Sequence, residues 1–369
     1  VSWHRYLSNL LGSQARAAAL ILGVFLGGLC IGYGLFGKLS RGRSPRALLA
    51  LCGKIEIFIG IWALIFPNLY RLVWENIGVL SPVVGASLFF DALLAATLIA
   101  LPTICMGGTL PLLTQGLSAD LEDASPFHAR VYAINTGGAF LGCLLTGLYL
   151  LPTYGLSNTM YIAGPMNVLA GGLLLLISRR LSNNEIEAGS ATTVVEETPE
   201  RYLSYSRAAA VAFLAGFYSL SLQVVFIRCV GLAAGSSEYA FSMVVAAYIL
   251  MLAFGAWRVA QVKRTPIPVW LNQLVALVGA GAVYLTVQNW PYYSHVIRVL
   301  FSSVPPAFYP YHLSLFAFLC LVLLVPVGAM GCTMPLLFGS VKNRFADLGS
   351  DVGRLYSWNT IGCVLGAVI

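Results

Sequence analysis

Charged side chains are scarce in this chain of 369 residues. Asp, Glu, Lys and Arg make up 9% of the sequence, whereas roughly a quarter is usual in soluble domains. Apolar residues make up 59%, and the mean hydropathy is +0.83. These values exclude a water-soluble domain, a disordered chain and a secreted disulfide scaffold. The composition therefore predicts an all-α protein that crosses a membrane several times.

Clusters of metal-binding residues are also missing from the sequence. The eight cysteines lie in or beside apolar runs without Cys-x-x-Cys spacing, and the four histidines are scattered. We interpret the cysteines as small buried hydrophobic residues, and we assign no metal, no cofactor and no catalytic residue to the chain. Lys and Arg number 21 against 14 acidic residues. We attribute this excess to membrane topology and not to a nucleic-acid partner.

Ten apolar runs are long enough to form a helix across a bilayer, which takes about 20 residues. In residue numbers the runs are 14–36, 47–66, 81–105, 131–151, 159–177, 208–230, 239–259, 267–287, 313–330 and 353–369. A polar stretch with five glutamates separates the fifth run from the sixth. Its composition is typical of a solvated linker.

Two blocks of the sequence occur twice, and one constant offset separates the copies of both. The block PTICMGGTLPLL at 102–113 returns as PVGAMGCTMPLL at 326–337, and RVYAINTGG at 130–138 returns as RLYSWNTIG at 354–362. Blocks that recur in one register indicate an internal duplication. We therefore predict a first membrane repeat over 1–178, a polar linker over 179–207 and a second, truncated membrane repeat over 208–369.

The duplication also predicts which helices this sequence lacks. Arg5 aligns with Arg228, but only Arg228 is preceded by a full apolar run. The run 159–177 has no counterpart in the second repeat. We expect the first and last helices to be largely missing from this sequence. The full protein would then hold two parallel six-helix repeats, an architecture like that of the major-facilitator transporters.

The distribution of Lys and Arg predicts the orientation of the chain. If the basic loop 38–46 is cytoplasmic, fifteen Lys and Arg residues fall on the cytoplasmic side and four on the outer side, as the positive-inside rule requires. The stretch 178–207 is then cytoplasmic. We expect a multi-pass protein of the plasma membrane, or of the inner membrane in a bacterium, that contacts the lipid bilayer.

Several motifs resemble the membrane region of the spermidine-synthase-like membrane proteins, often described as major-facilitator/spermidine-synthase fusions. The matching motifs are Trp3-His-Arg5, Glu56-Ile-Phe-Ile-Gly60, Met106-Gly-Gly-Thr-Leu-Pro111 and Tyr132-Ala-Ile-Asn135-Thr136-Gly-Gly138. The resemblance implies an integral membrane module that anchors or serves a cytoplasmic aminopropyltransferase-like domain. The glycine-rich nucleotide-binding signature of that domain is absent here, so catalysis would belong to sequence beyond Ile369.

A second resemblance is confined to one loop. The segment Gly37-Lys-Leu39-Ser-Arg41-Gly-Arg43-Ser-Pro-Arg46 is similar to a cytoplasmic loop of the major-facilitator superfamily. That family's loop carries an Asp-Arg pair, which is missing here. A basic cytoplasmic loop is the simpler interpretation.

Glu56 and Asp91 are the most informative candidates for a binding site. Each lies ten residues inside its apolar run, which predicts a depth of about 15 Å, near the middle of the bilayer. A carboxylate at that depth costs about 2.5–3.5 kcal/mol. We therefore expect either a cation or proton site, suited to a polyamine, or a carboxylate that is protonated or neutralised by a neighbouring Arg.

Thr109 and Thr333 belong to the repeated motif that we expect to end the runs 81–105 and 313–330. Pro111 and Pro335 lack a backbone N–H, which frees the carbonyl four residues earlier. The threonine hydroxyls can bind there, and the glycines of the motif let another backbone come close. Broken helices at matching places indicate a transporter site, but a hinge or a helix stop is the favoured interpretation.

Asn135 and Asn359 occupy equivalent positions in the second repeated block. An amide side chain in a membrane helix needs hydrogen-bond partners. We therefore predict that both side chains face the interior of the bundle. Packing between the two repeats is the favoured role, and substrate binding is the alternative.

Two further functions stay open beside the one that the resemblance implies. The chain could be a secondary transporter of a cationic or other small solute, with Glu56 and Asp91 along the path. It could also be a scaffold subunit that binds other subunits of a larger membrane complex.

Overall fold

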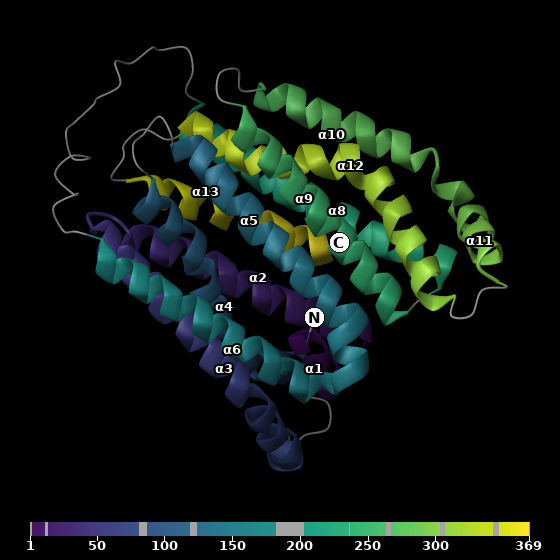
Figure 1. Cartoon of the computed structure of the whole chain (residues 1–369), viewed down its shortest axis with the longest axis horizontal. Coiled ribbons are helices and arrows are strands. Elements are labelled where there is room, and N and C mark those ends of the chain that lie inside the picture. Colours follow the sequence, from purple (N-terminus) through teal and green to yellow (C-terminus); the bar gives the residue numbers. More distant parts are fainter. Residues whose placement is uncertain are drawn as a thin grey trace. The chain divides into compact units, whose positions relative to one another are not determined.

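The computed structural model describes residues 2–11, 14–80, 87–118, 124–181, 203–235, 237–262, 267–302, 307–341 and 347–368. These residues are helical apart from short connections (Figure 1). The α-helices are α1 (Ser2–Leu11), α2 (Gln14–Leu39), α3 (Pro45–Leu80), α4 (Ser87–Leu117), α5 (Ala124–Leu145), α6 (Leu151–Arg180), α8 (Tyr205–Ala234), α9 (Glu238–Gln261), α10 (Val269–Tyr284), α11 (Trp290–Leu300), α12 (Phe308–Val341) and α13 (Leu348–Val368). A π-helical turn, Thr146–Leu150, joins α5 to α6, and a 3-10 turn, Val287–Asn289, precedes α11.

The all-α, multi-pass prediction is confirmed. Among the described residues, seven helices are long and apolar enough to cross a membrane, or eight if the bent pair Val269–Tyr284 and Val287–Leu300 forms one span. α13 is not among them, because it begins at Leu348 and so adds Ser350 and Asp351 to the predicted run 353–369, which already contains Arg354. Most of the predicted linker lies outside the described residues.

One candidate span, Ala124–Arg180, is 57 residues long. A single crossing takes about 20 residues, so this stretch is too long for one span. Its helix breaks at Gly155, whose φ of 75° is in the left-handed region that favours glycine. The break falls between the predicted runs 131–151 and 159–177.

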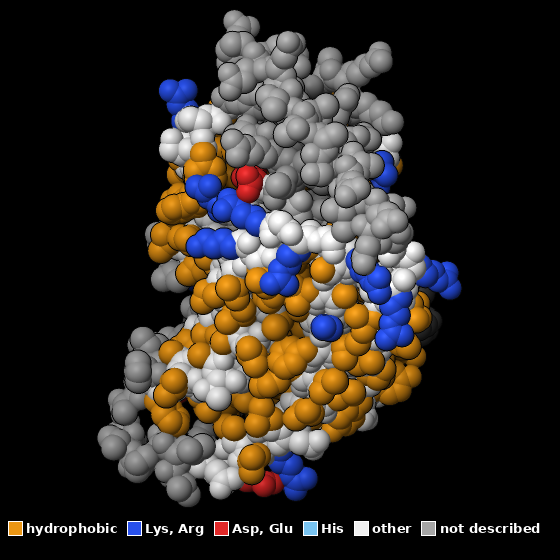
Figure 2. All heavy atoms as spheres, turned by 90° about the vertical axis from the view of Figure 1, so that its left-hand side faces the viewer, with side chains coloured by type: hydrophobic (Ala, Val, Ile, Leu, Met, Phe, Trp, Pro, Cys, Tyr) orange, Lys and Arg blue, Asp and Glu red, His pale blue; other side chains and the backbone are white. Residues whose placement is uncertain are grey.

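Hydrophobic side chains cover the surface that a bilayer would contact. On the face drawn in Figure 2, they form a broad belt, and Lys and Arg side chains gather along one border of it. Many large apolar side chains are exposed, among them Leu169 at 68% and Leu321 at 72%. In water such a surface would drive aggregation, whereas lipid solvates it.

The helices form two compact units that do not follow the order of the sequence. Unit 1 comprises Val1–Ala124, Thr153–Phe217 and Phe338–Ile369, and unit 2 comprises Ser125–Pro152 and Tyr218–Leu337. Helix α5 therefore packs with helices from the second half of the chain, and α13 packs with helices from the first half. The chain also passes from unit 1 to unit 2 within α8.

Glycines bring the helices of unit 1 into backbone contact. A Cβ added at Gly32 of α2 would collide with the carbonyl oxygen of Ile104 on α4, and one at Gly107 would lie 3.0 Å from the Cα of Gly32. Likewise α6 packs on α3, because a Cβ at Gly60 would lie 2.6 Å from the carbonyl oxygen of Gly164. Close approach of this kind is the usual way that membrane helices gain packing energy.

In unit 2, a glycine brings the backbones of α9 and α12 into close contact in the same way. A Cβ at Gly331 would lie 2.8 Å from the Cα of Leu252. The prediction that the glycines of the repeated motif admit another backbone is thus confirmed at both Gly107 and Gly331. Around these contacts the core of unit 2 is built from large buried side chains that include Met243, Tyr248 and Leu319.

The predicted ends of the helices that carry the motif are wrong. α4 continues past residue 105 to Leu117, and α12 continues past residue 330 to Val341, with Pro111 and Pro335 inside them. Proline inside a membrane helix is tolerated where neighbouring helices and Ser or Thr hydroxyls satisfy the backbone groups that it frees. The motif is therefore a packing segment inside a continuous helix and not a helix stop.

Candidate functional site

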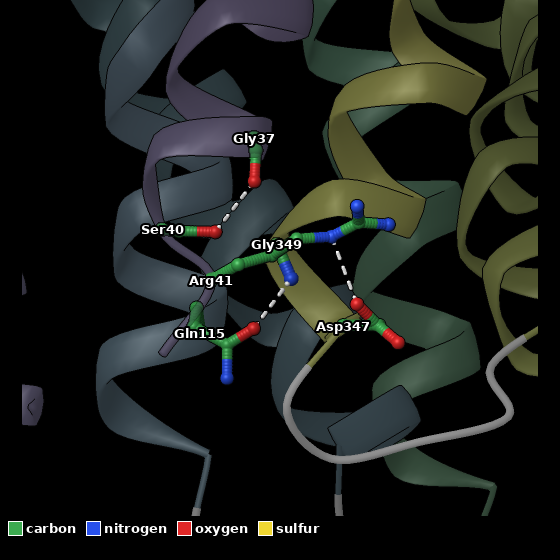
Figure 3. A network of polar contacts seen from close by, with 6 residues as sticks. All are labelled: Gly37, Ser40, Arg41, Gln115, Asp347 and Gly349. Carbon is green, nitrogen blue, oxygen red and sulfur yellow. Dashed lines mark hydrogen bonds and ion pairs between the residues drawn. The ribbon is translucent and has the colours of Figure 1, made fainter. Parts of the chain in front are cut away.

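A group of polar contacts joins the ends of α2 and α4 to the start of α13, all within unit 1 (Figure 3). The chain leaves α2 through Ser40, whose hydroxyl donates to the carbonyl oxygen of Gly37 at 2.8 Å. Gly42 then turns the chain with a φ of 65°. These two residues let the basic loop leave α2 beside α13.

An ion pair joins this loop to the residue that precedes α13. Arg41 Nε lies 2.8 Å from Asp347 Oδ1, and the two side chains are 50% and 32% exposed. Partly exposed pairs of this kind contribute about 0–1 kcal/mol. Sequence reasoning found no acidic partner for this loop, because Asp347 lies in the opposite half of the chain.

Gln115 holds the start of α13 from α4. Its Oε1 accepts a hydrogen bond from the backbone N–H of Gly349 at 2.9 Å, and the contact is buried. The first N–H groups of a helix have no hydrogen-bond partner within the helix, and burying an N–H without a partner costs free energy. Gln115 gives the N–H of Gly349 its partner. Gly349 has no room for a side chain, because a Cβ there would lie 2.9 Å from the carbonyl oxygen of Pro111.

Asp351 lies one turn further along α13, outside the candidate spans. Burial and the nearby carboxylate of Asp347 raise its pKa to about 6, against the opposing effects of Arg354 and Arg41. Asp351 therefore changes charge close to neutral pH. Protonation removes the charge, and with it both the cost of burying that charge and its repulsion by Asp347. The folded state therefore becomes more stable as the pH falls from about 6 towards the ordinary pKa of 3.8.

Arg354 links the same helix end to α8. Its guanidinium carbon lies 3.8 Å from the centre of the Tyr205 ring. A cation over an aromatic face contributes about 0.5–1 kcal/mol at an exposed site. The side chains of this group are Arg41, Gln115, Asp347, Asp351 and Arg354. Together they lie where α2, α4, α8 and α13 meet in unit 1.

Glu56 and Asp91 lie at different distances from the described starts of their helices. Glu56 lies eleven residues into the candidate span Pro45–Asn76, but Asp91 follows the first residue of the span Phe90–Leu117. Because α4 begins at Ser87, Asp91 stands near the beginning of its helix. Both side chains are half-buried, and neither forms a hydrogen bond or an ion pair with any part of the chain that the structure describes.

Thr109 and Thr333 have different partners. The Thr109 hydroxyl donates to Met106 O on its own helix at 2.9 Å. The Thr333 hydroxyl donates to Ala329 O at 3.3 Å and accepts from Asn272 Nδ2 at 3.1 Å and from Gln273 Nε2 at 2.9 Å. The hydroxyls therefore bond elsewhere than to the carbonyls that the prolines free, and only Thr333 belongs to a network between helices.

Asn135 and Asn359 differ as well. Asn359 is half-buried in unit 1, and its Nδ2 donates to Ala212 O on α8 at 3.0 Å. Asn135 in unit 2 is exposed, so within the described residues it does not face the bundle interior as predicted.

The six predicted site residues are divided between the two units. Asn135 and Thr333 belong to unit 2, and the other four belong to unit 1. Sequence reasoning missed Gln115 and the pair Asn272 and Gln273. Asn272 and Gln273 gave a signal, because they are amides inside the apolar run 267–287, but they lie outside the repeated blocks from which the other polar candidates came. Gln115 gave none, because it lies beyond the end of the run 81–105. Within the described ranges, no three His, Cys, Asp or Glu side chains gather to hold a metal ion.

Comparison with known proteins finds a weak similarity. The chain matches no family model. It is 24% identical over 184 residues to Polyamine aminopropyltransferase 1 of Streptomyces coelicolor (strain ATCC BAA-471 / A3(2) / M145), and the match covers 49% of this chain and 32% of that protein. The chain thus spans about a third of the length of that relative. It is a multi-pass membrane protein with a weak relation to a polyamine aminopropyltransferase.

Proposed function

We propose that this chain is the integral membrane module of a spermidine-synthase-like protein, and that it anchors or serves a cytoplasmic aminopropyltransferase-like domain. The similarity to Polyamine aminopropyltransferase 1 carries the proposal. The motifs Met106–Pro111 and Tyr132–Gly138 support it, because they resemble the membrane region of such proteins. No residue of this chain is assigned a role in catalysis.

The proposed architecture is two parallel repeats. Helix starts support it, because α2 and α9 begin at Gln14 and Glu238, and α5 and α13 begin at Ala124 and Leu348. Both pairs of starts have the same offset as the repeated blocks. In this arrangement the basic loop and the Arg41–Asp347 pair face the cytoplasm, the side on which the enzyme domain would lie.

The test is the intact mass of the polypeptide purified from its natural host, with peptide mapping of both ends and an assay of aminopropyl transfer to a diamine. The 369 residues have a mass of 39.6 kDa. We expect a mass larger by about 25–35 kDa, as for one further domain, together with transfer activity. A polypeptide larger only by two helices and without activity would contradict the proposal.

Transport of a small cationic solute is the second candidate function. Glu56 supports it, because a half-buried carboxylate far inside a candidate span, without a partner among the described residues, is usually functional. The test is polyamine uptake into proteoliposomes with Glu56→Gln and Asp91→Asn. The matched control is Glu75→Gln, which removes an exposed carboxylate paired with Arg71 on the same helix. Uptake that survives both test variants would remove these carboxylates from the proposal.

A further inference from the structure

Glu56 interrupts a buried stripe of α3 in unit 1. Cys52 and Ile59, one turn before and one turn after it, are 1% and 2% exposed, and they belong to one apolar cluster with Leu112 of α4. Residues three or four apart lie on the same face of a helix. The carboxyl group of Glu56 therefore stands on the face of α3 that packs on α4, and it is half-buried there.

Asn167 interrupts a similar stripe of α6. Met160 and Leu174 lie seven residues before and after it, which is about two helical turns and therefore the same face. Met160 is 5% exposed in the cluster that contains Leu98 of α4. Leu174 packs against the cluster that contains Leu112 of α4. Asn167, which is half-buried, thus stands on the face of α6 that turns towards α4.

Glycine contacts fix how α3 and α6 are aligned. A Cβ at Gly60 would lie 2.6 Å from the carbonyl oxygen of Gly164, and one at Gly53 would lie 2.7 Å from the carbonyl oxygen of Gly171. The later residue of α3 thus meets the earlier residue of α6, so the two helices run antiparallel. This register sets residue 56 opposite residue 168.

Glu56 and Asn167 consequently share one level of unit 1. Neither side chain forms a hydrogen bond or an ion pair with the residues that the structure describes. Inside a membrane, carboxyl and amide groups need such partners. The second repeat has Ala280 at the position equivalent to Glu56, so the helices of that repeat pack without a carboxyl group there.

We propose that Glu56 and Asn167 bind a singly charged cationic group, either an alkali ion or the ammonium group of an amine. The carboxylate oxygens of Glu56 and Oδ1 of Asn167 are the ligands, because such groups bind to oxygen atoms. Without the cation, Glu56 holds a proton, since an unpaired carboxylate is costly at this depth. Binding of the cation therefore releases the proton of Glu56 to water.

The surroundings of Glu56 supply no fixed positive charge. The apolar cluster around it draws residues from α2, α3, α4 and α6, and its ionisable members are Cys52 and Cys105, which are uncharged as thiols. Lys54 lies two residues before Glu56 on α3, but it is exposed and points to another side of the helix. Among the described residues, the proton or the bound cation is thus what balances the charge of Glu56.

This inference rests on the transport candidate above and adds to it a second ligand and the exchange of a proton. Occupancy of the site is measured without transport, so the two ideas fail separately. Occupancy without uptake would keep the site and remove transport. Uptake without occupancy would keep transport and overturn the site.

Carbodiimide labelling of the full-length protein measures this occupancy. Dicyclohexylcarbodiimide is apolar and adds to protonated carboxyl groups, so it should label Glu56 at pH 7, as read by mass spectrometry of the peptide. Sodium, potassium or putrescine should slow the labelling about tenfold at about ten times Kd, because only empty sites react. Tetramethylammonium chloride at the same concentration is the salt control. Glu75, exposed and paired with Arg71, should stay unlabelled.

Asn167→Ala tests the second ligand. It should raise the protecting concentration about tenfold, as for one lost polar contact, while Glu56 still reacts. Asn158→Ala, at an exposed position of the same helix, is the matched control and should behave as the wild type. Equal protection in the two variants would contradict the proposal. If Asn167→Ala does not fold, Asn167→Leu gives the same test with a side chain suited to an apolar bundle.

The cation that protects Glu56 identifies the ligand. Protection by sodium or potassium assigns an alkali ion, and protection by putrescine assigns an amine. Equal labelling with and without every cation, or equal protection by tetramethylammonium, would overturn the proposal. A Glu56 that never reacts would overturn it as well, because the carboxylate would then be ionised and paired with a cationic side chain.

Discussion

The two copies of the repeated block, at 102–113 and 326–337, keep the same packing motif, but the polar contacts around them differ. Asn272 and Gln273 of α10 donate to Thr333, whereas the equivalent residues of the first copy are Leu48 and Leu49, both fully buried. In the first copy, Thr109 bonds only within its own helix. A shared motif thus sets how closely two helices approach, while the facing helix decides whether a network forms.

The largest effect is expected when the amide found at Asn272 is placed at Leu48, the position that the offset of the repeated blocks pairs with it. Leu48→Asn buries an amide at a position that is 0% exposed, in the apolar cluster that also contains Leu112 of α4. We expect a loss of about 3–5 kcal/mol in the free energy of unfolding, measured by denaturant titration in detergent. Leu72→Asn on the same helix, at a position 59% exposed, is the control and should change stability little. Equal losses would show that burial is not the cause.

The reverse exchange should cost less. Asn272→Leu removes the donors to Ala329 O and to Thr333 Oγ1, but Gln273 still reaches Thr333. We expect a loss of about 1–3 kcal/mol, because one buried carbonyl loses a donor. Val278→Leu, on the side of α10 where that residue is 62% exposed, should leave the same unfolding curve unchanged. An Asn272→Leu variant more stable than the wild type would mean that the network does not stabilise unit 2.

A third difference between the copies is electrostatic. Asp351 has Phe127 as its counterpart in the first copy, so only α13 carries a carboxylate there. Because burial and Asp347 raise the pKa of Asp351 to about 6, Asp351→Asn should raise Tm by about 2–4 °C at pH 7.5. The gain should shrink as the pH falls below about 6 and be lost only below the ordinary value of 3.8, where Asp351 is protonated in the folded and the unfolded state alike. A gain that does not depend on pH would contradict the assignment.

The smallest effect concerns the exposed ion pair that joins the two copies. Asp347→Ala and Arg41→Ala should each cost no more than about 1 kcal/mol, because the pair is partly exposed and screened by salt. A double-mutant cycle at low and high salt measures the coupling between the two side chains. A coupling well above about 1 kcal/mol that resists salt would show that the pair is far more shielded from water than its exposure indicates.

Much of the fold followed from the sequence. Long apolar runs predicted membrane helices because backbone groups in a bilayer must bond within their own segment. The glycines at 107 and 331 predicted close backbone contacts, and both contacts are present. The helix ends were wrong, because a proline frees one carbonyl but does not end a helix whose neighbours hold it in place.

The candidate site was less predictable than the fold. The apolar run placed Asp91 ten residues from its start, whereas the described part of α4 begins at Ser87, four residues before Asp91. Sequence spacing also could not show that Asp347 meets Arg41 or that Gln115 meets Gly349, since the members of each pair lie in opposite halves of the chain. Such contacts depend on which helices pack together.

By itself, the sequence determined that this protein is helical, crosses the membrane several times and contains a repeated motif, because hydropathy and backbone hydrogen bonding act locally along the chain. The tertiary structure alone decided that α5 packs with the second half and α13 with the first. It also decided that Asn359 has a partner while Asn135 is exposed. Equivalent residues differ here because the energy of a polar group in a membrane depends on the helix beside it.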